Sequence, residues 1–249
     1  MTDHSARRCV VLPVVLLAVL LAAGCATNRH IGFPYPNEQL VPPADPDTLP
    51  AIAVGEVRDL RPRRQRDGRG HFTGIDYPGD HQWDVPVTAM YRRALARDID
   101  QTRLGRVVPL PAEADYLLEA EILSFGCRLE RRTASLLLPA GVGALGGLAW
   151  GTDGSDQLKR GLLLSVVALG ALPVPARQHA EAEVRLLVRD RAGDLIWETT
   201  CAGNLDRTVA ETFTARRDRT WAERYMPQAV KRCNACLLGQ LRQFLASRP

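Results

Sequence analysis

The chain has 249 residues, of which 46% are hydrophobic and 24% are charged, and its formal net charge is +4 at pH 7. This length allows one hydrophobic core, or one core with an insertion, and excludes a chain of many domains. The excess of positive charge is mild, so it indicates either solubility or contact with an anionic lipid or glycan surface.

The first 24 residues have the pattern of an export signal. Arg7 and Arg8 form a short positive region, an apolar run covers residues 9–24, and small residues precede Cys25. A charged start, an apolar centre and small residues in that order are typical of a secretory signal peptide. The sequence therefore predicts a protein exported from the cytoplasm, which excludes nucleic acid as an expected partner.

The end of this segment, "LLAAGC", resembles the lipobox of bacterial lipoproteins. The match departs mildly from the usual pattern, because Ala22 takes the place of a leucine and Leu21 lies one position earlier. The resemblance implies that Cys25 carries acyl chains, palmitate among them, and becomes the mature N-terminus. Ala26 follows it, which by analogy with enteric bacteria implies an outer-membrane location on the periplasmic face. A plain signal peptide and an uncleaved membrane helix are the alternatives.

Residues 25–50 are rich in proline, with six prolines between positions 34 and 50. This composition favours an extended, semi-rigid chain of about 3 Å per residue. We expect this segment to be a tether between the acylated cysteine and a folded domain over residues 51–249.

The folded domain is expected to begin with a strand at residues 51–57 and a long loop rich in Arg, Gly and Pro. Asp84 is placed to cap a helix whose apolar residues recur at helical spacing. These residues are Val87, Tyr91, Leu95 and Ile99. A brief strand at residues 105–110 and a longer one at 114–130 follow. The apolar parity of the longer strand slips, which predicts a β-bulge near residues 124–126.

The C-terminal part predicts two further strands and a helix. Residues 181–190 alternate between apolar and charged side chains, which indicates one buried and one solvated face. A turn at 191–194 leads to a strand at 195–203, and an apolar stripe predicts a helix over 227–247. The expected fold class is α+β, with a mixed or antiparallel sheet, two helices packed on one face, and an apolar helical-hairpin insertion.

The element order and the phrase "ADYLLEAEI", residues 114–122, are weakly similar to those of the curli-secretion lipoprotein and related periplasmic assembly lipoproteins. The similarity spans about residues 51–130. It implies a small periplasmic α/β domain and carries over no catalytic residue.

The insertion at residues 135–175 contains two uncharged apolar runs, 136–151 and 161–175. Prolines placed to begin and end helices predict a helical hairpin. Three glycines four residues apart form a smooth stripe, as in a glycine zipper. These are Gly143, Gly147 and Gly151. In water each glycine costs a helix about 1 kcal/mol relative to alanine, so this hairpin needs an apolar host or a close partner.

Three environments of the hairpin are compatible with the sequence. A helix of sixteen residues extends about 24 Å, whereas a bilayer core is about 30 Å thick. Residues 136–173 therefore associate with a membrane, pack on their own domain, or lie between subunits of a homo-oligomer. Gly141, Gly143 and Gly146 also spell the G-x-G-x-x-G pattern, but no acidic residue follows about 20 positions later, so no cofactor is expected.

The mature chain keeps four cysteines besides the acylated one. They are Cys127, Cys201, Cys233 and Cys236. An even number in an oxidising compartment predicts disulfides. Because the last helix is expected to pack over the sheet, the favoured pairing bonds Cys127 and Cys201 each to one of the two helix cysteines. Unbonded core thiols and a C-x-x-C redox motif are the alternatives, although a redox motif needs a helix N-terminus.

Candidate catalytic, metal-binding and ligand-binding residues are few. The loop at residues 71–81 contains His71, Asp76, Asp80 and His81, but its turn residues favour a solvated loop, and neither G-x-S-x-G nor H-E-x-x-H is present. No catalytic residue and no metal site are therefore predicted. A run of arginines is favoured as solvated, with contact to lipid phosphate or acidic glycan as the alternative. The run comprises Arg58, Arg61, Arg63, Arg64, Arg66 and Arg69.

The sequence thus favours a non-enzymatic outer-membrane lipoprotein that serves as an envelope assembly, scaffold or transport-accessory module. Its expected partners are the membrane, through Cys25 and the apolar hairpin, and sister subunits or another envelope protein. The alternatives are a periplasmic thiol oxidoreductase that uses Cys233 and Cys236, a hydrolase that uses the loop at residues 71–81, and a lipid or small-ligand carrier.

Overall fold

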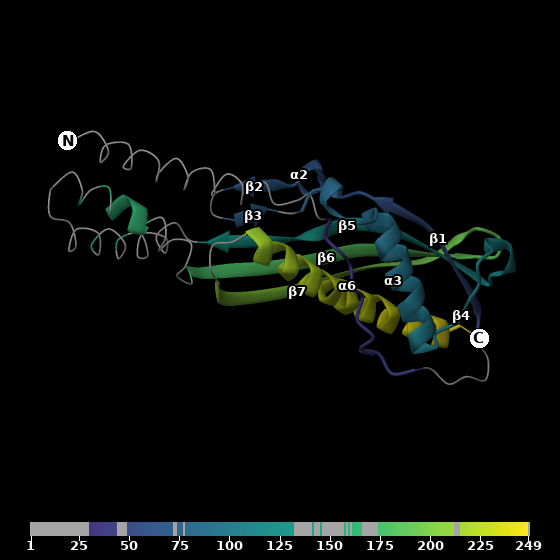
Figure 1. Ribbon diagram of the computed structural model, residues 1–249. Coiled ribbons are helices and arrows are strands. Elements are labelled where there is room, and N and C mark those ends of the chain that lie inside the picture. The colour runs from purple at the N-terminus through teal and green to yellow at the C-terminus, as the bar shows by residue number, and fades with distance from the viewer. Residues whose placement is uncertain are drawn as a thin grey trace, which may run out of the picture. The chain divides into compact units, whose positions relative to one another are not determined.

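Two long helices cover one face of a mixed seven-stranded sheet in this computed structural model (Figure 1). The structure describes residues 30–43, 49–71, 74–76, 78–131, 141, 145, 157, 159, 161–165, 174–211 and 215–248. The α+β class and the mixed sheet predicted from the sequence are confirmed.

The sheet is built around β5, its central strand. The strands are β1 (Ala51–Asp59), β2 (Arg69–His71), β3 (Gly74–Asp76), β4 (Arg106–Val107), β5 (Tyr116–Arg131), β6 (Val174–Asp190) and β7 (Leu195–Glu211). One edge of β5 pairs with β6 along its whole length, and β6 pairs with β7, all antiparallel. The other edge pairs first with β1, in parallel, and then with β3, antiparallel. β4 continues the sheet beyond β1, and β2 continues it beyond β3.

The helix α3 (Val87–Thr102) packs against β1 and the helix α6. Its predicted apolar stripe is confirmed. Val87, Tyr91, Leu95 and Ile99 are all buried. The helix has Pro86 as its N-cap rather than Asp84. Asp84 instead donates its backbone N–H to the carbonyl oxygen of Ile31, so this residue belongs to a bridge that precedes the helix.

The helix α6 (Ala215–Ala246) is longer than predicted and contains Pro227 in its interior. The sequence favoured a start at this proline, because proline is tolerated in the first turn and removes a backbone hydrogen bond elsewhere. Trp221 and Ala222 are buried on the preceding turns. The burial of these side chains offsets the hydrogen bond that Pro227 removes, so the helix continues toward its N-terminal side.

The predicted β-bulge in β5 is confirmed, since the register against β6 shifts between Ile122 and Ser124. The shift keeps Ile122 and Phe125 in the same core despite their odd spacing. It also lies where the pairing with β1 has ended and the pairing with β3 has not begun, so among the described residues no strand pairs with this edge of β5 at the bulge. Side chains replace that strand: Phe125 donates its backbone N–H to Gln65, and Arg61 donates to the Phe125 carbonyl oxygen.

The apolar insertion leaves the domain between two paired strands. Arg131, at the end of β5, pairs with Ala176 near the start of β6, so the two roots of the insertion lie side by side. β6 begins at Val174, so the last two residues of the expected hairpin at 135–175 belong to a strand. Helical residues in this segment are Gly141, Leu145, Gln157, Lys159 and residues 161–165, and the rest of residues 135–173 lie outside the described ranges.

Within the described ranges, no helix has both the length and the apolar character that a membrane crossing requires.

Residues 31–43, which we call the strap, belong to the segment expected to be an extended tether over residues 25–50, and they lie against the domain. At one end Ile31 forms a parallel bridge with Trp83. Farther along, the Gln39 side chain donates to the carbonyl oxygen of Gln101 at the end of α3. Arg242 of α6 donates to the carbonyl oxygen of Pro42. The sequence did not predict this docking, because its contacts are far apart along the chain.

Candidate functional site

The strap is fastened by a polar network buried between α3 and α6. Lys231 of α6 forms an ion pair with Asp98 of α3, and their side chains are only 6% and 3% exposed. The Tyr35 hydroxyl of the strap donates to the same carboxylate. Asn234 donates to Asp98 over 2.8 Å and accepts from the Tyr91 hydroxyl over 2.8 Å. One carboxylate therefore joins both helices to the strap.

Burial controls the chemistry of this network. Burial and the adjacent Asp98 carboxylate raise the pKa of Tyr35 well above its ordinary value, and burial does the same to Tyr91. Both phenols therefore remain neutral donors. A buried carboxylate that lost its cation would be strongly unfavourable, so the ion pair keeps α3 and α6 together, and the Tyr35 hydroxyl attaches the strap to that pair.

Cys201 of β7 and Cys236 of α6 form a disulfide. This bond is one of those expected from the sequence. Cys233 keeps its thiol, which donates to the Cys201 carbonyl oxygen over 3.2 Å, so the expected second bond between Cys233 and Cys127 is not formed. Burial raises the pKa of Cys233 to about 12. Cys127 is also buried, on the core face of β5.

The other site residues expected from the sequence lie outside the described ranges. These are Cys25, the proposed acylation site, and the glycine stripe Gly143, Gly147 and Gly151.

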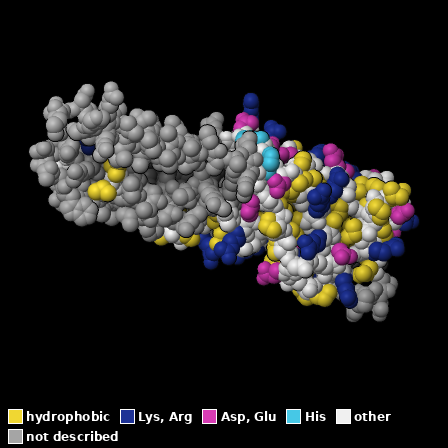
Figure 2. Space-filling model, in the orientation of Figure 1, with side chains coloured by type: hydrophobic (Ala, Val, Ile, Leu, Met, Phe, Trp, Pro, Cys, Tyr) yellow, Lys and Arg dark blue, Asp and Glu magenta, His cyan; other side chains and the backbone are white. Residues whose placement is uncertain are grey.

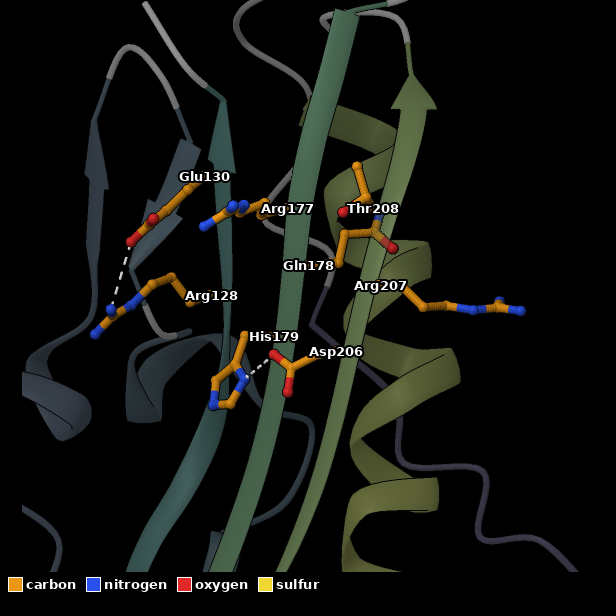
Figure 3. Close-up of a pocket in the computed structure, with 8 residues that line it drawn as sticks. All are labelled: Arg128, Glu130, Arg177, Gln178, His179, Asp206, Arg207 and Thr208. Atoms are coloured by element: carbon orange, nitrogen blue, oxygen red, sulfur yellow. Dashed lines mark hydrogen bonds and ion pairs between the residues drawn. The ribbon is translucent and has the colours of Figure 1, made fainter.

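The face of the sheet opposite α3 and α6 carries a polar pocket of about 450 Å³ (Figure 3). Successive side chains of a strand point to opposite faces, and Ala180 and Ala182 of β6 lie in the core. His179 and Glu181, which alternate with them, therefore point to the open face. His179 of β6 and Asp206 of β7 face each other there with 2.6 Å between the imidazole Nδ1 and a carboxylate oxygen (Figure 3).

The pocket continues into a chain of hydrogen bonds. His179 Nε2 lies 3.1 Å from one oxygen of Glu181, and the Ser124 hydroxyl donates to the other oxygen over 2.6 Å. Partial burial disfavours the imidazolium, but hydrogen bonds to Asp206 and Glu181 outweigh it and raise the pKa of His179. The carboxylate lies between the hydroxyl and the imidazole, whereas a serine nucleophile needs the imidazole next to its hydroxyl.

Arginines contribute the remaining charge of the pocket. Arg128 forms an ion pair with Glu130 at 3.4 Å, and Arg177 lines the same face. Arg207 points away from these side chains (Figure 3) and lies over the ring of Tyr225. The lining thus mixes cations and carboxylates, an arrangement for binding polar groups rather than apolar ligands.

The arginine run divides into buried and exposed members. Arg61 is a structural residue, because its side chain is fully buried and pairs with Asp59 and Asp80. Arg58 pairs with Glu121 at 3.0 Å. Three arginines are exposed on the short helix α2 (Arg63–Asp67). They are Arg63, Arg64 and Arg66. On the face seen in Figure 2, Lys and Arg side chains are interspersed with Asp and Glu.

The loop at residues 71–81 does not assemble as a site from its described side chains. Asp80 pairs with Arg61, and His81 is exposed. The side chains of His71 and Asp76, as well as Arg69 before them, lie outside the described set. In the part of the chain that the structure describes, no group of three His, Cys, Asp or Glu residues could hold a metal ion.

Comparison with known proteins gives only distant likenesses. No family model matches the chain, and no curated protein matches it. Among solved structures, it is similar to protein XCC0632 from Xanthomonas campestris, of the DUF330 family model, with 14% identity over 88% of this chain and 98% of that chain and a TM-score of 0.45. It is also similar to lipoprotein GNA1162 from Neisseria meningitidis, with 10% identity over 79% of this chain and 95% of that chain and a TM-score of 0.31. A Caulobacter crescentus protein described as a lipoprotein gives 13% identity over 62% of this chain and 83% of that chain, with a TM-score of 0.33. These identities and TM-scores are too low to assign the chain to a family or to transfer a function to it.

Proposed function

We propose that the protein is a non-enzymatic lipoprotein of the bacterial envelope, anchored through Cys25 to the outer membrane on its periplasmic face. Its α+β domain acts as an assembly, scaffold or transport-accessory module held against that membrane. The signal-like residues 1–24 and the lipobox-like "LLAAGC" support the anchor. The disulfide between Cys201 and Cys236 supports export, because such bonds persist in oxidising compartments.

The docked strap is the observation that carries this proposal. The strap is fixed to the domain from Ile31 onward, so only residues 26–30 separate it from an acylated Cys25. A fully extended chain covers about 3.5 Å per residue, which limits the distance from Cys25 to Ile31 to about 20 Å. A short linker of this kind suits a domain that works at the membrane surface.

The described cysteines support a structural role over the thiol oxidoreductase alternative. A redox motif needs an accessible thiol with a lowered pKa, usually at a helix N-terminus. Cys233 is buried inside α6 with a raised pKa, and Cys236 is bonded to Cys201 instead of its C-x-x-C neighbour. The order of Ser124, Glu181 and His179 likewise disfavours a serine hydrolase.

The apolar insertion is the second element that we expect to contact the membrane or sister subunits. Its two roots, Arg131 and Val174, lie at the ends of the paired strands β5 and β6. A loop carried on two long paired strands is well placed to reach a surface outside its own domain. Residues 136–173, with the glycine stripe that they contain, would make that contact.

Detergent-phase partitioning of the full chain and of a Cys25→Ser variant tests the anchor. We expect the native chain in the detergent phase, because several acyl chains together give stable anchoring, and we expect the variant to lose that contribution. A second variant, with residues 132–173 replaced by a short turn, isolates the insertion. If the Cys25→Ser variant partitions as the native chain does and loses detergent affinity only when the insertion is removed, the lipid anchor is not what holds the protein.

A further inference from the structure

The exposed arginines of α2 are the feature that the proposed function leaves unexplained. We infer that α2 binds the phosphate groups of anionic phospholipids in the membrane that holds the acylated N-terminus. The inference rests on the proposed lipid anchor and adds to it an electrostatic contact at a defined surface. Three observations carry it: the orientation of α2, its position beside the strap, and the short reach of the linker.

The orientation of α2 is fixed by its one buried residue. Gln65 donates to the Ser124 hydroxyl over 2.9 Å and accepts from the Phe125 backbone N–H over 3.1 Å. These bonds hold the Gln65 side of the helix on the bulge of β5. Its other side chains are exposed: Arg63, Arg64, Arg66 and Asp67. The segment therefore presents three cations and one anion to the surroundings.

The acidic residue of α2 does not cancel its arginines. Arg63 lies 3.3 Å from Asp67, with side chains 87% and 57% exposed. An exposed ion pair of this kind is weak, so its guanidinium can exchange partners. Guanidinium groups bind phosphate with two parallel hydrogen bonds, which makes arginine better suited to headgroup phosphate than lysine is.

A short series of contacts connects α2 to the place where the chain leaves for Cys25. Ile31 donates its backbone N–H to the carbonyl oxygen of Gln82 over 2.6 Å. The Gln82 side chain in turn accepts from the Gly79 N–H over 2.8 Å. The backbone of Gly79 packs against α2, because an added Cβ there would lie 2.6 Å from the Asp67 carbonyl oxygen. The last turn of α2 is therefore connected to Ile31 through the contacts of Gly79 and Gln82.

The length of the linker brings this surface to the membrane. The six residue steps from Cys25 to Ile31 span about 20 Å when fully extended and less in any other conformation. Because α2 is connected to Ile31 through Gly79 and Gln82, this limit also confines its arginines to the neighbourhood of the leaflet that holds the acyl chains. Near an anionic surface each arginine strengthens association about fivefold.

The opposite end of the domain supplies a matched control. The strap runs from Ile31 to Pro42, beside Arg242 and the end of α3, so its far end lies away from α2. Three exposed arginines lie at that far end of the sheet, near the start of β1 or the turn between β6 and β7. They are Arg103, Arg106 and Arg191. Their replacement removes the same charge from a surface that the linker does not hold at the membrane.

Hydrogen exchange of the acylated full chain in nanodiscs tests the inference. One set of discs contains phosphatidylethanolamine alone, and the other contains equal parts of phosphatidylethanolamine and phosphatidylglycerol. We expect exchange over residues 63–67 to slow about fivefold or more in the anionic discs, and high salt to reverse the effect. An R63Q/R64Q/R66Q variant should lose this slowing, whereas an R103Q/R106Q/R191Q variant should keep it, and equal melting temperatures would verify that both variants fold.

Equal exchange in the two kinds of disc would overturn the inference, and so would loss of the slowing in both variants. Acylation of each preparation is measured first by mass. If the chain is acylated and its exchange is equal in the two discs, the proposed contact by α2 is ruled out and the proposed lipid anchor is not affected. A chain without acyl groups removes the proposed anchor and this inference with it.

Discussion

Gly203 of β7 is a residue where the sheet and α6 approach each other closely. A Cβ added there would lie 2.0 Å from the carbonyl oxygen of Ala229, a backbone atom that cannot move without the helix. Overpacking of this kind destabilises by about 1–3 kcal/mol, so we expect Gly203→Ala to reduce the free energy of unfolding by about 3 kcal/mol. Chemical denaturation measures the change.

Gly239 lies on α6 and is the matched control for Gly203 of β7. A Cβ at Gly239 would have no neighbour within 4 Å, so alanine there removes only the cost of glycine in a helix. We expect Gly239→Ala to stabilise the protein by up to about 1 kcal/mol. Similar effects of the two substitutions would contradict the close packing of α6 on β7.

His179 makes the stability of the open face depend on pH. Its pKa is raised in the folded protein above an ordinary value of 6.5, so the folded state holds the proton more tightly than the unfolded state. The stabilisation is therefore complete below about pH 6.5 and is lost as the pH rises through the folded pKa. His179→Gln should reduce stability more at pH 5.5 than at pH 8.5, by less than about 1 kcal/mol because the pair is partly exposed. A difference that does not change between these pH values would contradict the ion pairs with Asp206 and Glu181.

At the scale of elements, the buried ion pair holds the strap and the two helices together. Lys231→Met leaves the Asp98 carboxylate buried without its cation, so we expect a loss of about 3–5 kcal/mol in the free energy of unfolding. Faster hydrogen exchange around Tyr35 should accompany it, because that hydroxyl donates to the same carboxylate. Arg191→Gln breaks an exposed pair and should cost less than about 1 kcal/mol. Equal losses of stability in the two variants would contradict the role of the buried ion pair in holding the helices and the strap together.

The disulfide fastens α6 to β7 in the same way. It joins residues 35 positions apart, and closing a loop of that length is expected to stabilise the folded state by about 3–4 kcal/mol. A C201A/C236A variant should lose that amount in thermal or chemical denaturation. Alkylation offers a second test, since Cys233 should react only after unfolding. Rapid labelling of Cys233 in the native protein would contradict its burial and raised pKa.

Elements with a local signature were predictable from the sequence. The apolar spacing of α3 and the alternation in β6 arise from side chains a few residues apart, and both predictions are confirmed. The bulge in β5 also leaves a local trace, because it reverses the apolar parity of the strand. The predicted start of α6 at Pro227 was wrong, because the burial of Trp221 outweighs the tendency of proline to begin a helix.

Features made by distant residues could not be predicted in this way. Lys231 and Asp98 are 133 positions apart, and nothing near either residue in the sequence indicates the other. The docked strap, the network that fastens it and the pairing of His179 with Asp206 all depend on such contacts. The sequence predicted disulfides between strand cysteines and helix cysteines. Which helix cysteine bonds to Cys201 depends on how α6 packs on β7, and it is Cys236 rather than Cys233.

At the scale of the whole molecule, the proposed function depends on how the domain is attached to the membrane. The strap is the docked part of the segment expected to be an extended tether, so residues 26–30 alone separate the docked chain from Cys25. The roots of the apolar insertion lie at the ends of the paired strands β5 and β6, and we propose that the insertion is a second contact of the same domain with its surroundings. If Cys25 is acylated as proposed, we expect the domain to present its surfaces at the membrane.

Mass analysis of the N-terminal peptide from the membrane-extracted protein tests the central claim most directly. We predict that the mature chain begins at Cys25. In the peptide of residues 25–29, Cys25 should carry a diacylglyceryl group and an amide-linked acyl chain. An unmodified Cys25, or a mature chain that begins at another residue, would contradict it.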